Sequence, residues 1–118
     1  MTNQELIAKA KEVMTKAYAP YSHFQVGAAL LAKDGRVFTG CNVENATYGA
    51  TICAERTAVT KAVSEGVREF EKIAIVASSG EYAAPCGICR QVLFEFMPEG
   101  KVVLWSELEG EKEFALTE

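Results

Sequence analysis

Apolar side chains near the amino end recur at every third or fourth position, the spacing of one face of a helix. Residues Gln4–Tyr18 show this pattern, with lysines and a glutamate between the apolar positions. Thr2 or Asn3 can cap the start of the helix, and Ala19-Pro20 ends the run. The pattern therefore predicts a first, amphipathic helix over residues 4–18.

The next segment changes from helical to strand spacing. Gln25–Ala32 and Arg36–Asn42 are strand-like runs separated by a turn that contains Asp34-Gly35. An Asp-Gly pair between two such runs predicts a β-hairpin. Val43–Thr51 is small and polar and predicts a loop, after which helical spacing resumes over Ile52–Gly66.

The carboxyl half alternates strands with one further helix. Lys72–Ala77 is almost wholly apolar, as in a strand that is buried on both faces. The loop Ser78–Pro85 precedes a predicted helix over Cys86–Met97, which Pro98 and Gly100 end. Lys101–Trp105 predicts a fourth strand and Lys112–Leu116 a fifth.

This order of elements indicates the fold class. Strand–helix–strand units pair in parallel through right-handed crossovers, whereas a hairpin pairs antiparallel. We therefore expect a three-layer α-β-α domain of the α/β class, with a mixed sheet of about five strands and helices on both faces. The 118 residues, 49% of them hydrophobic, are enough for one core and too few for two, so a single domain over residues 1–118 is predicted.

Charge and cysteine content narrow the class of function. The net charge is −4 without any basic run, which disfavours a nucleic-acid polymer as partner. No apolar run approaches the roughly 20 residues of a membrane helix, and the first residues do not resemble a signal peptide. Four cysteines in such a chain indicate reduced thiols that are bound to metal or buried. We therefore expect a cytoplasmic protein with no membrane partner.

Two short cysteine motifs point to metal chemistry. Cys53 and Glu55 lie in the sequence C-A-E, and Cys86 and Cys89 lie in P-C-G-I-C. Catalytic zinc is usually held by three protein ligands with a water in the fourth position, and a nearby acid can move the protons of that water. Both motifs fall where a loop becomes a helix, and there the free N–H groups favour thiolates. Three thiols and one acid therefore indicate hydrolysis at a zinc ion.

Other uses of the cysteines remain open at this point. A lone C-x-x-C can be a redox pair or half of a structural zinc knuckle. A structural zinc ion would need a fourth ligand, from Cys41 or His23. Cys41 is more simply interpreted as a small buried side chain at a strand end, and His23 as a histidine in a polar turn. Glu55 favours a catalytic site, because a purely structural one needs no acid.

Arginines next to the motifs can balance the charge of the thiolates. Zinc with three thiolates carries a formal charge of −1, which weakens the metal as a Lewis acid. Arg56 follows Glu55 directly and can donate hydrogen bonds to the sulfurs. Arg90 follows Cys89 and is a second candidate, although taken alone it is better explained as a surface ion pair.

These motifs, together with several other segments, resemble the zinc-dependent cytidine deaminase family, in particular its small homotetrameric members. The resemblance extends from about residue 4 to residue 116 and rests on five segments: Tyr18-Ala19-Pro20-Tyr21-Ser22, Phe24-Gln25-Val26-Gly27-Ala28-Ala29, Gly40-Cys41-Asn42-Val43-Glu44-Asn45, Cys53-Ala54-Glu55-Arg56-Thr57-Ala58 and Pro85-Cys86-Gly87-Ile88-Cys89-Arg90-Gln91.

The resemblance implies a mechanism of hydrolytic deamination. One zinc ion per chain would be held by Cys53, Cys86 and Cys89, with water or hydroxide as its fourth ligand. Glu55 would take a proton from that water and deliver protons to the pyrimidine ring nitrogen and the leaving amine. Cytidine and deoxycytidine would then yield uridine and deoxyuridine with release of ammonia, as in pyrimidine salvage. Arg56 would hold the thiolates.

The resemblance also implies substrate contacts. The ribose contacts of the family fall on Asn42 and Glu44, and a carboxylate and an amide are suited to sugar hydroxyls. Phe24 would form an apolar wall beside the base, and backbone groups of Ala54 would contact the base edge. Without the resemblance, Asn42 and Glu44 would be interpreted as loop-capping residues and Phe24 as core.

One departure from the family pattern concerns the carboxyl end. Family members usually continue with an L-L-P segment and a short tail, whose phenylalanine reaches the site of a neighbouring subunit. This sequence stops at Thr117-Glu118, so we expect a domain that lacks the tail but still forms a homotetramer. The expected partner is a small nucleoside. The alternatives are a related deaminase of another aminated base or of a polynucleotide, and a non-catalytic zinc-stabilised domain.

Overall fold

A mixed sheet with the strand order β2-β1-β3-β4-β5 organises the chain in the computed structural model, which describes residues 1–117. The expected domain end at Glu118 lies outside the described residues. The elements are, in chain order, α1 (Asn3–Met14), β1 (Val26–Ala32), β2 (Val37–Cys41), the short 3₁₀ helix η1 (Tyr48–Ala50), α2 (Ala54–Ser64), β3 (Phe70–Ala77), α3 (Gly87–Phe96), β4 (Lys101–Ser106) and β5 (Gly110–Ala115).

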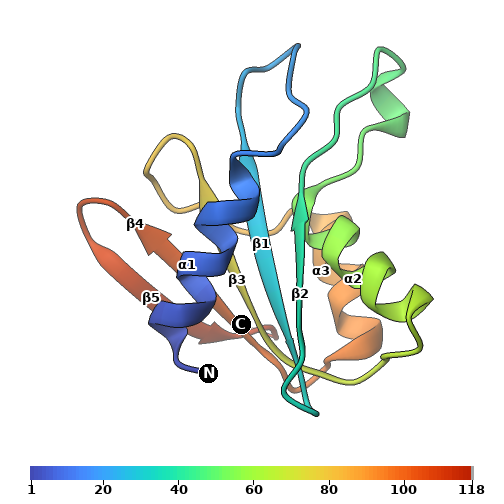
Figure 1. Ribbon diagram of the computed structural model, residues 1–118, viewed down its shortest axis with the longest axis vertical. Coiled ribbons are helices and arrows are strands. Elements are labelled where there is room, and N and C mark those ends of the chain that lie inside the picture. The colour runs from blue at the N-terminus through green and yellow to red at the C-terminus, as the bar shows by residue number, and fades with distance from the viewer. Residues whose placement is uncertain (118) are drawn as a thin grey trace.

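Helices cover both faces of the sheet, as the sequence predicts. β1 pairs antiparallel with β2 and β3, β3 pairs parallel with β4, and β4 pairs antiparallel with β5. In Figure 1, α1 crosses one face, while α2 and α3 lie side by side on the other. The three-layer α-β-α fold class is therefore confirmed. Among the described residues, no helix has both the length and the apolar character that crossing a membrane requires.

Two hydrophobic clusters fill the spaces between the layers. Along β1 the side chains alternate between them: Ala28 and Leu30 pack toward α2 and α3, whereas Ala29 and Leu31 pack toward α1. Residues 73–77 of β3 are all buried, which confirms the prediction of a strand covered on both faces. Since β1 and β3 form the middle of the sheet, they provide a rigid base for the loops at their ends.

The first helix is shorter than its hydrophobic pattern predicts. It begins with a capping box between Thr2 and Glu5 and ends at Met14, so the predicted end at Tyr18 is wrong. The backbone of Tyr18 instead donates to the carbonyl of Asn42 (3.0 Å) and accepts from the N–H of Glu44 (2.8 Å). A tertiary β-bridge therefore takes the backbone groups that a longer helix would have used.

The boundaries of other helices and strands differ from the predicted ones by a few residues. α2 begins at Ala54, two residues later than predicted, because Cys53 is its N-cap and has an extended backbone. β3 begins two residues earlier, at Phe70, and β5 two residues earlier, at Gly110. The predicted loop 43–51 also contains η1.

Gly40 allows α2 to lie unusually close to β2. A Cβ atom at residue 40 would lie 2.5 Å from the carbonyl oxygen of Ala54 and 2.5 Å from the backbone nitrogen of Ala58. Real Cβ atoms do not approach backbone atoms so closely. A side chain at residue 40 would therefore displace the first turn of α2. The position of Glu55, in that same turn, therefore depends on a glycine in the neighbouring strand.

We expect Gly40→Ala to lower the free energy of unfolding by about 1–3 kcal/mol, the usual effect of overpacking a filled space. Gly49→Ala is the matched control, because a Cβ there meets no atom within 4 Å. Urea denaturation of both variants and the parent chain measures the difference. Equal stability of the Gly40→Ala variant and the parent would contradict the close approach.

Candidate active site

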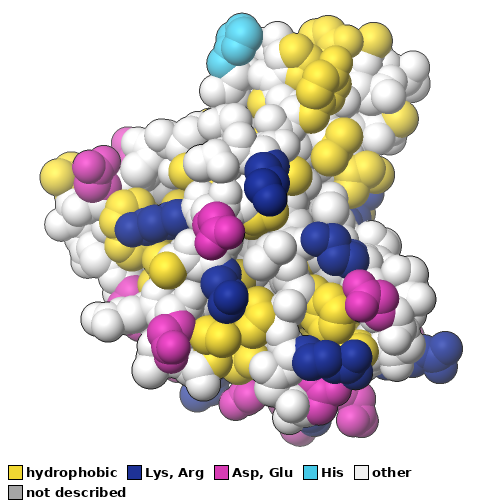
Figure 2. All heavy atoms as spheres, in the orientation of Figure 1, with side chains coloured by type: hydrophobic (Ala, Val, Ile, Leu, Met, Phe, Trp, Pro, Cys, Tyr) yellow, Lys and Arg dark blue, Asp and Glu magenta, His cyan; other side chains and the backbone are white. Residues whose placement is uncertain are grey.

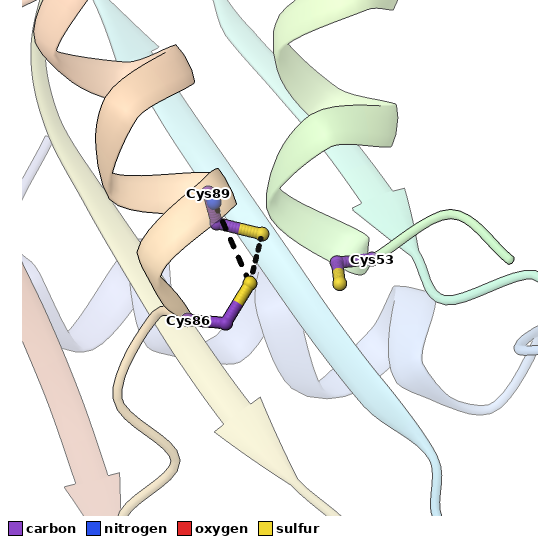
Figure 3. Close-up of side chains that lie close together, drawn as sticks. All are labelled: Cys53, Cys86 and Cys89. Atoms are coloured by element: carbon purple, nitrogen blue, oxygen red, sulfur yellow. Dashed lines mark hydrogen bonds between the residues drawn. The ribbon is translucent and has the colours of Figure 1, made fainter. Parts of the chain in front are cut away.

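The N-termini of α2 and α3 bring three thiols together at one end of the sheet. Cys53 is the N-cap of α2, Cys86 is the N-cap of α3, and Cys89 lies in the first turn of α3. Their sulfur atoms all lie within 4.8 Å of one another. Figure 3 shows Cys86 and Cys89 pointing from α3 toward Cys53 across the space between the helices. The two motifs, which are more than thirty positions apart in the sequence, thus form one cluster.

The cluster fits a single zinc ion. Ligand atoms 2.3 Å from a tetrahedral zinc ion are about 3.8 Å apart. The sulfur atoms of the cluster, all within 4.8 Å of one another, have a comparable spacing. The sulfurs of Cys86 and Cys89 are 3.3 Å apart, and the N–H of Cys89 donates to the sulfur of Cys86 over 3.4 Å. Soft thiolate donors select zinc over magnesium or calcium. The donor set and the spacing both suit the metal that the sequence predicts.

The remaining cysteine and the histidine do not join the cluster. Among residues 1–117, only Cys53, Cys86 and Cys89 form a group of at least three potential metal-binding side chains. Cys41 is partly exposed, so its predicted burial is only partial, because it ends β2 at the edge of the sheet. His23 lies exposed in a turn with a φ of 61°. Neither residue supplies a fourth ligand for a structural site.

Arg56 approaches the thiols as predicted. It donates to the carbonyl oxygen of Thr51 (3.2 Å) and to the sulfur of Cys53 (3.7 Å). The hydrogen bond to Cys53 raises the pKa of the guanidinium, partly offset by desolvation. Its Nε is buried without a hydrogen-bond partner among the described residues. The group is therefore held toward the sulfurs, where a cation offsets thiolate charge.

Among residues 1–117, Arg90 does not form the surface ion pair inferred for it. Arg90 donates instead to the backbone carbonyl of Leu116, from the first half of α3 to the residue that follows β5. A carbonyl oxygen at the end of a strand needs a donor, and the guanidinium supplies it. Arg90 thus fastens the carboxyl end of the chain to α3 and leaves Arg56 as the arginine beside the thiols.

Glu55 is a buried carboxyl beside this cluster. It lies in the first turn of α2 and is only 6% exposed. Burial raises its pKa, against the opposing effects of its own backbone N–H, Cys89 and Arg56. A buried carboxyl whose pKa is raised accepts a proton more readily than an exposed carboxylate does, and a general acid–base group must both accept and release protons.

A cavity of about 320 Å³ connects most of the predicted site residues. Its lining includes seven of them: Phe24, Asn42, Glu44, Cys53, Ala54, Glu55 and Cys86. Cys89 and Arg56 are not part of this lining, but the sulfur of Cys89 lies 3.3 Å from that of Cys86 and Arg56 donates to the sulfur of Cys53. The cavity therefore brings the predicted base wall, sugar contacts, acid and two thiols to one place.

The rest of the lining consists of residues that no motif in the sequence points to. These residues are Val26, Tyr48, Thr51, Ile75, Ala83 and Ala84. Most are small or apolar, and such residues have no chemical signature in a single sequence. Tyr48 is 89% exposed, and the exposure of a large aromatic side chain at the cavity is visible only in the structure.

Asn42 and Glu44 connect the cavity to the segment before β1. The side chain of Asn42 accepts from the N–H of Val26 and donates to the carbonyl of Phe24, both over 2.8 Å. The carboxylate of Glu44 accepts from the backbone N–H groups of Tyr21 (3.0 Å) and Ser22 (3.1 Å). The hydrogen bonds from Ser22 and Tyr21 lower the pKa of Glu44, so it is an anion and an acceptor.

We expect Cys53→Ala, Cys86→Ala and Cys89→Ala each to lose bound zinc, because only two thiols would then remain to hold the ion. Cys41→Ala is the matched control and should retain about one zinc ion per chain. Metal analysis after gel filtration, together with a thermal melt of each variant, measures both the content and the integrity of the fold. Zinc loss from Cys41→Ala would indicate a four-thiolate structural site instead.

Comparisons with known proteins agree with this geometry. Residues 1–105 match the family described as the cytidine and deoxycytidylate deaminase zinc-binding region. A cytidine deaminase of Sporosarcina psychrophila is 50% identical over 113 residues, which are 96% of this chain and 83% of that protein. One of Halalkalibacterium halodurans is 52% identical over 111 residues, 94% of this chain and 84% of the other. The crystal structure of cytidine deaminase from Burkholderia pseudomallei superposes with a TM-score of 0.92 at 49% identity, covering 98% of this chain and 94% of that one. The chain therefore belongs to the family of zinc-binding cytidine and deoxycytidylate deaminases.

Proposed function

We propose that this chain is a zinc-dependent cytidine deaminase, which hydrolyses cytidine and deoxycytidine to uridine and deoxyuridine with release of ammonia. The observation that carries the proposal is that the buried carboxyl of Glu55 faces the same cavity as the thiols of Cys53 and Cys86. An acid beside a metal site, within a cavity of nucleoside size, is the arrangement that hydrolytic deamination needs. Membership of the deaminase family supports the same reaction.

In this proposal the thiols of Cys53, Cys86 and Cys89 hold one zinc ion. Bound zinc supplies a Lewis acid that makes water acidic enough to react near neutral pH. Glu55 passes one proton of the water to the ring nitrogen and the second to the amine, while the water oxygen bonds to the ring carbon that bears the amine and the carbon–nitrogen bond breaks to release ammonia. Its burial and raised pKa suit this transfer. Arg56 draws charge away from the sulfurs through its hydrogen bond to Cys53.

The other lining residues are proposed to bind the nucleoside. Phe24 provides the apolar wall beside the pyrimidine, and backbone groups of Ala54 contact its edge. Asn42 and Glu44 bind the hydroxyl groups of the sugar. Each side-chain group of Asn42 that bonds to the backbone retains capacity for one more hydrogen bond, and the Glu44 carboxylate accepts from sugar hydroxyls.

The charge of the cavity favours a free nucleoside over a nucleotide or a polynucleotide. Its lining includes two carboxyl groups, of Glu44 and Glu55, and the thiols of Cys53 and Cys86. Within the described part of the chain, no lysine, arginine or histidine lines it. A phosphate group on the sugar would meet carboxylates without a compensating cation, and such an arrangement opposes binding.

We further propose that the protein works as a homotetramer in the cytoplasm. Large apolar side chains are exposed on the loops around the cavity: Tyr18, Tyr21, Phe24, Val43, Tyr48 and Ile52. Figure 2 shows hydrophobic side chains gathered there, near the single histidine. Exposed apolar groups of this kind mark association surfaces. The free thiols at the metal site suit a reducing compartment.

The direct test of the reaction uses Glu55→Gln. We expect the parent chain to release ammonia from cytidine, and the variant to keep about one zinc ion per chain while turnover falls by about 10²–10⁴-fold, because the proton shuttle is lost. Ammonia release and zinc content are measured on the same samples. Zinc loss in the variant would make Glu55 a ligand instead. A zinc-loaded parent that leaves cytidine, deoxycytidine and other aminated bases unchanged would favour a non-catalytic domain.

Light scattering tests the assembly. The parent chain should have a mass near four times its 12.8 kDa, with the dihedral symmetry common in tetramers. Tyr18→Glu places a charge among the exposed apolar side chains and should shift the population to smaller species. Leu108→Glu is the control, since Leu108 is 94% exposed in the turn between β4 and β5. A monomeric parent would contradict the proposed tetramer.

A further inference from the structure

The hydroxyl of Ser22 joins two of the residues that the proposed function assigns to the substrate. It donates to Oε2 of Glu44, and its oxygen accepts from the backbone N–H of Phe24 over 3.0 Å. One hydroxyl thus connects Glu44, the proposed sugar-binding carboxylate, with Phe24, the residue proposed to lie beside the base.

The carboxylate of Glu44 depends on this neighbour for its orientation. Its Oε1 accepts from the backbone N–H groups of Tyr21 and Ser22, while its Oε2 accepts from the Ser22 hydroxyl. The two oxygens are therefore held from the same side by one turn of chain, which leaves their remaining lone pairs for a ligand. Without the hydroxyl, Oε2 loses its partner and the carboxylate can rotate.

The location of this contact matches the place of the sugar. Glu44 lines the 320 Å³ cavity that contains Glu55, and it also lines an adjoining cavity of about 370 Å³, whose lining includes Ser22. Tyr48 and Thr51 are likewise shared by the two cavities. A nucleoside whose base lies toward Glu55 would therefore place its sugar at this boundary, beside the Ser22–Glu44 contact.

We propose that Ser22 is a positioning residue, which orients the Glu44 carboxylate toward the sugar hydroxyls of the nucleoside. This proposal rests on the proposed function. It assigns Ser22 an effect on nucleoside binding that is transmitted through the sugar, with no part in proton transfer or in zinc binding.

The test combines a variant of the residue with a variant of the substrate. Ser22→Ala should raise the KM for cytidine about three- to tenfold, the effect of one net hydrogen bond, with kcat unchanged within about twofold. With 2′,3′-dideoxycytidine, which has no hydroxyl for Glu44 to accept from at those carbons, the same substitution should change KM by less than about twofold. Ser22→Thr keeps the hydroxyl and should restore the parent KM.

Ser78→Ala is the matched control. The Ser78 hydroxyl accepts from the N–H of Gln25 over 3.0 Å, so it holds the same segment of chain but does not contact Glu44. This control should leave both KM values unchanged. Titration calorimetry with uridine provides a second readout that is independent of turnover, and Ser22→Ala should weaken uridine binding by the same factor as it raises KM.

The outcomes separate this proposal from the function on which it rests. If the parent chain releases no ammonia from cytidine, the proposed function fails and the role of Ser22 fails with it. If the parent is active but Ser22→Ala raises KM equally for both substrates, lowers kcat alone, or behaves like Ser78→Ala, only the positioning role is overturned. Unchanged uridine affinity in Ser22→Ala would also overturn it.

Discussion

The close approach of two helix N-termini is the constraint on which the site depends. α2 and α3 lie side by side on one face of the sheet, and each begins with a cysteine as its N-cap. Free N–H groups at such termini stabilise negative charge, and the N–H of Cys89 donates to the sulfur of Cys86 in the same geometry that collects the thiols. The same first turn of α2 carries Glu55 into the protein interior. Any shift of α2 along the sheet would therefore move a thiol and the carboxyl together, and Gly40 is what lets α2 lie at this distance.

The opposite side of the cavity is built in a different way. It consists of loop residues before β1 and after β2, which are held together by backbone and side-chain hydrogen bonds. The side chain of Asn42 forms hydrogen bonds with Phe24 and Val26, and the carboxylate of Glu44 accepts from Tyr21 and Ser22. The backbone of Tyr18 forms hydrogen bonds with the backbone of Asn42 and of Glu44. The metal-binding half is thus fixed by helix packing, whereas the proposed nucleoside-binding half is fixed by a network of polar contacts at the surface.

Electrostatics connects the two halves. Glu44, Glu55 and the thiols of Cys53 and Cys86 line the cavity without a cation among the described residues, and Arg56 is the cation that donates to the sulfur of Cys53. Bound zinc would offset the negative charge of the thiolates that hold it, which is one physical reason for its place beside the proposed acid, Glu55. The same balance opposes an anionic substrate and is consistent with a neutral nucleoside, and the acidic chain as a whole agrees with it.

The sequence by itself determined the elements, the fold class and the chemical groups of the site. Helical and strand periodicity are local properties, and the spacing of Cys86 and Cys89 within one helical turn already places two thiols on one face. Tertiary structure decided the rest. The end of α1 at Met14 follows from a β-bridge to a segment more than twenty residues away, and the bond from Arg90 to Leu116 joins elements that no local pattern relates. The meeting of Cys53 with the other thiols, the burial of Glu55 and the contact between Ser22 and Glu44 likewise arise from packing between distant segments. Such contacts depend on how the layers are placed in space, and the periodicity of a single segment carries no information about that placement.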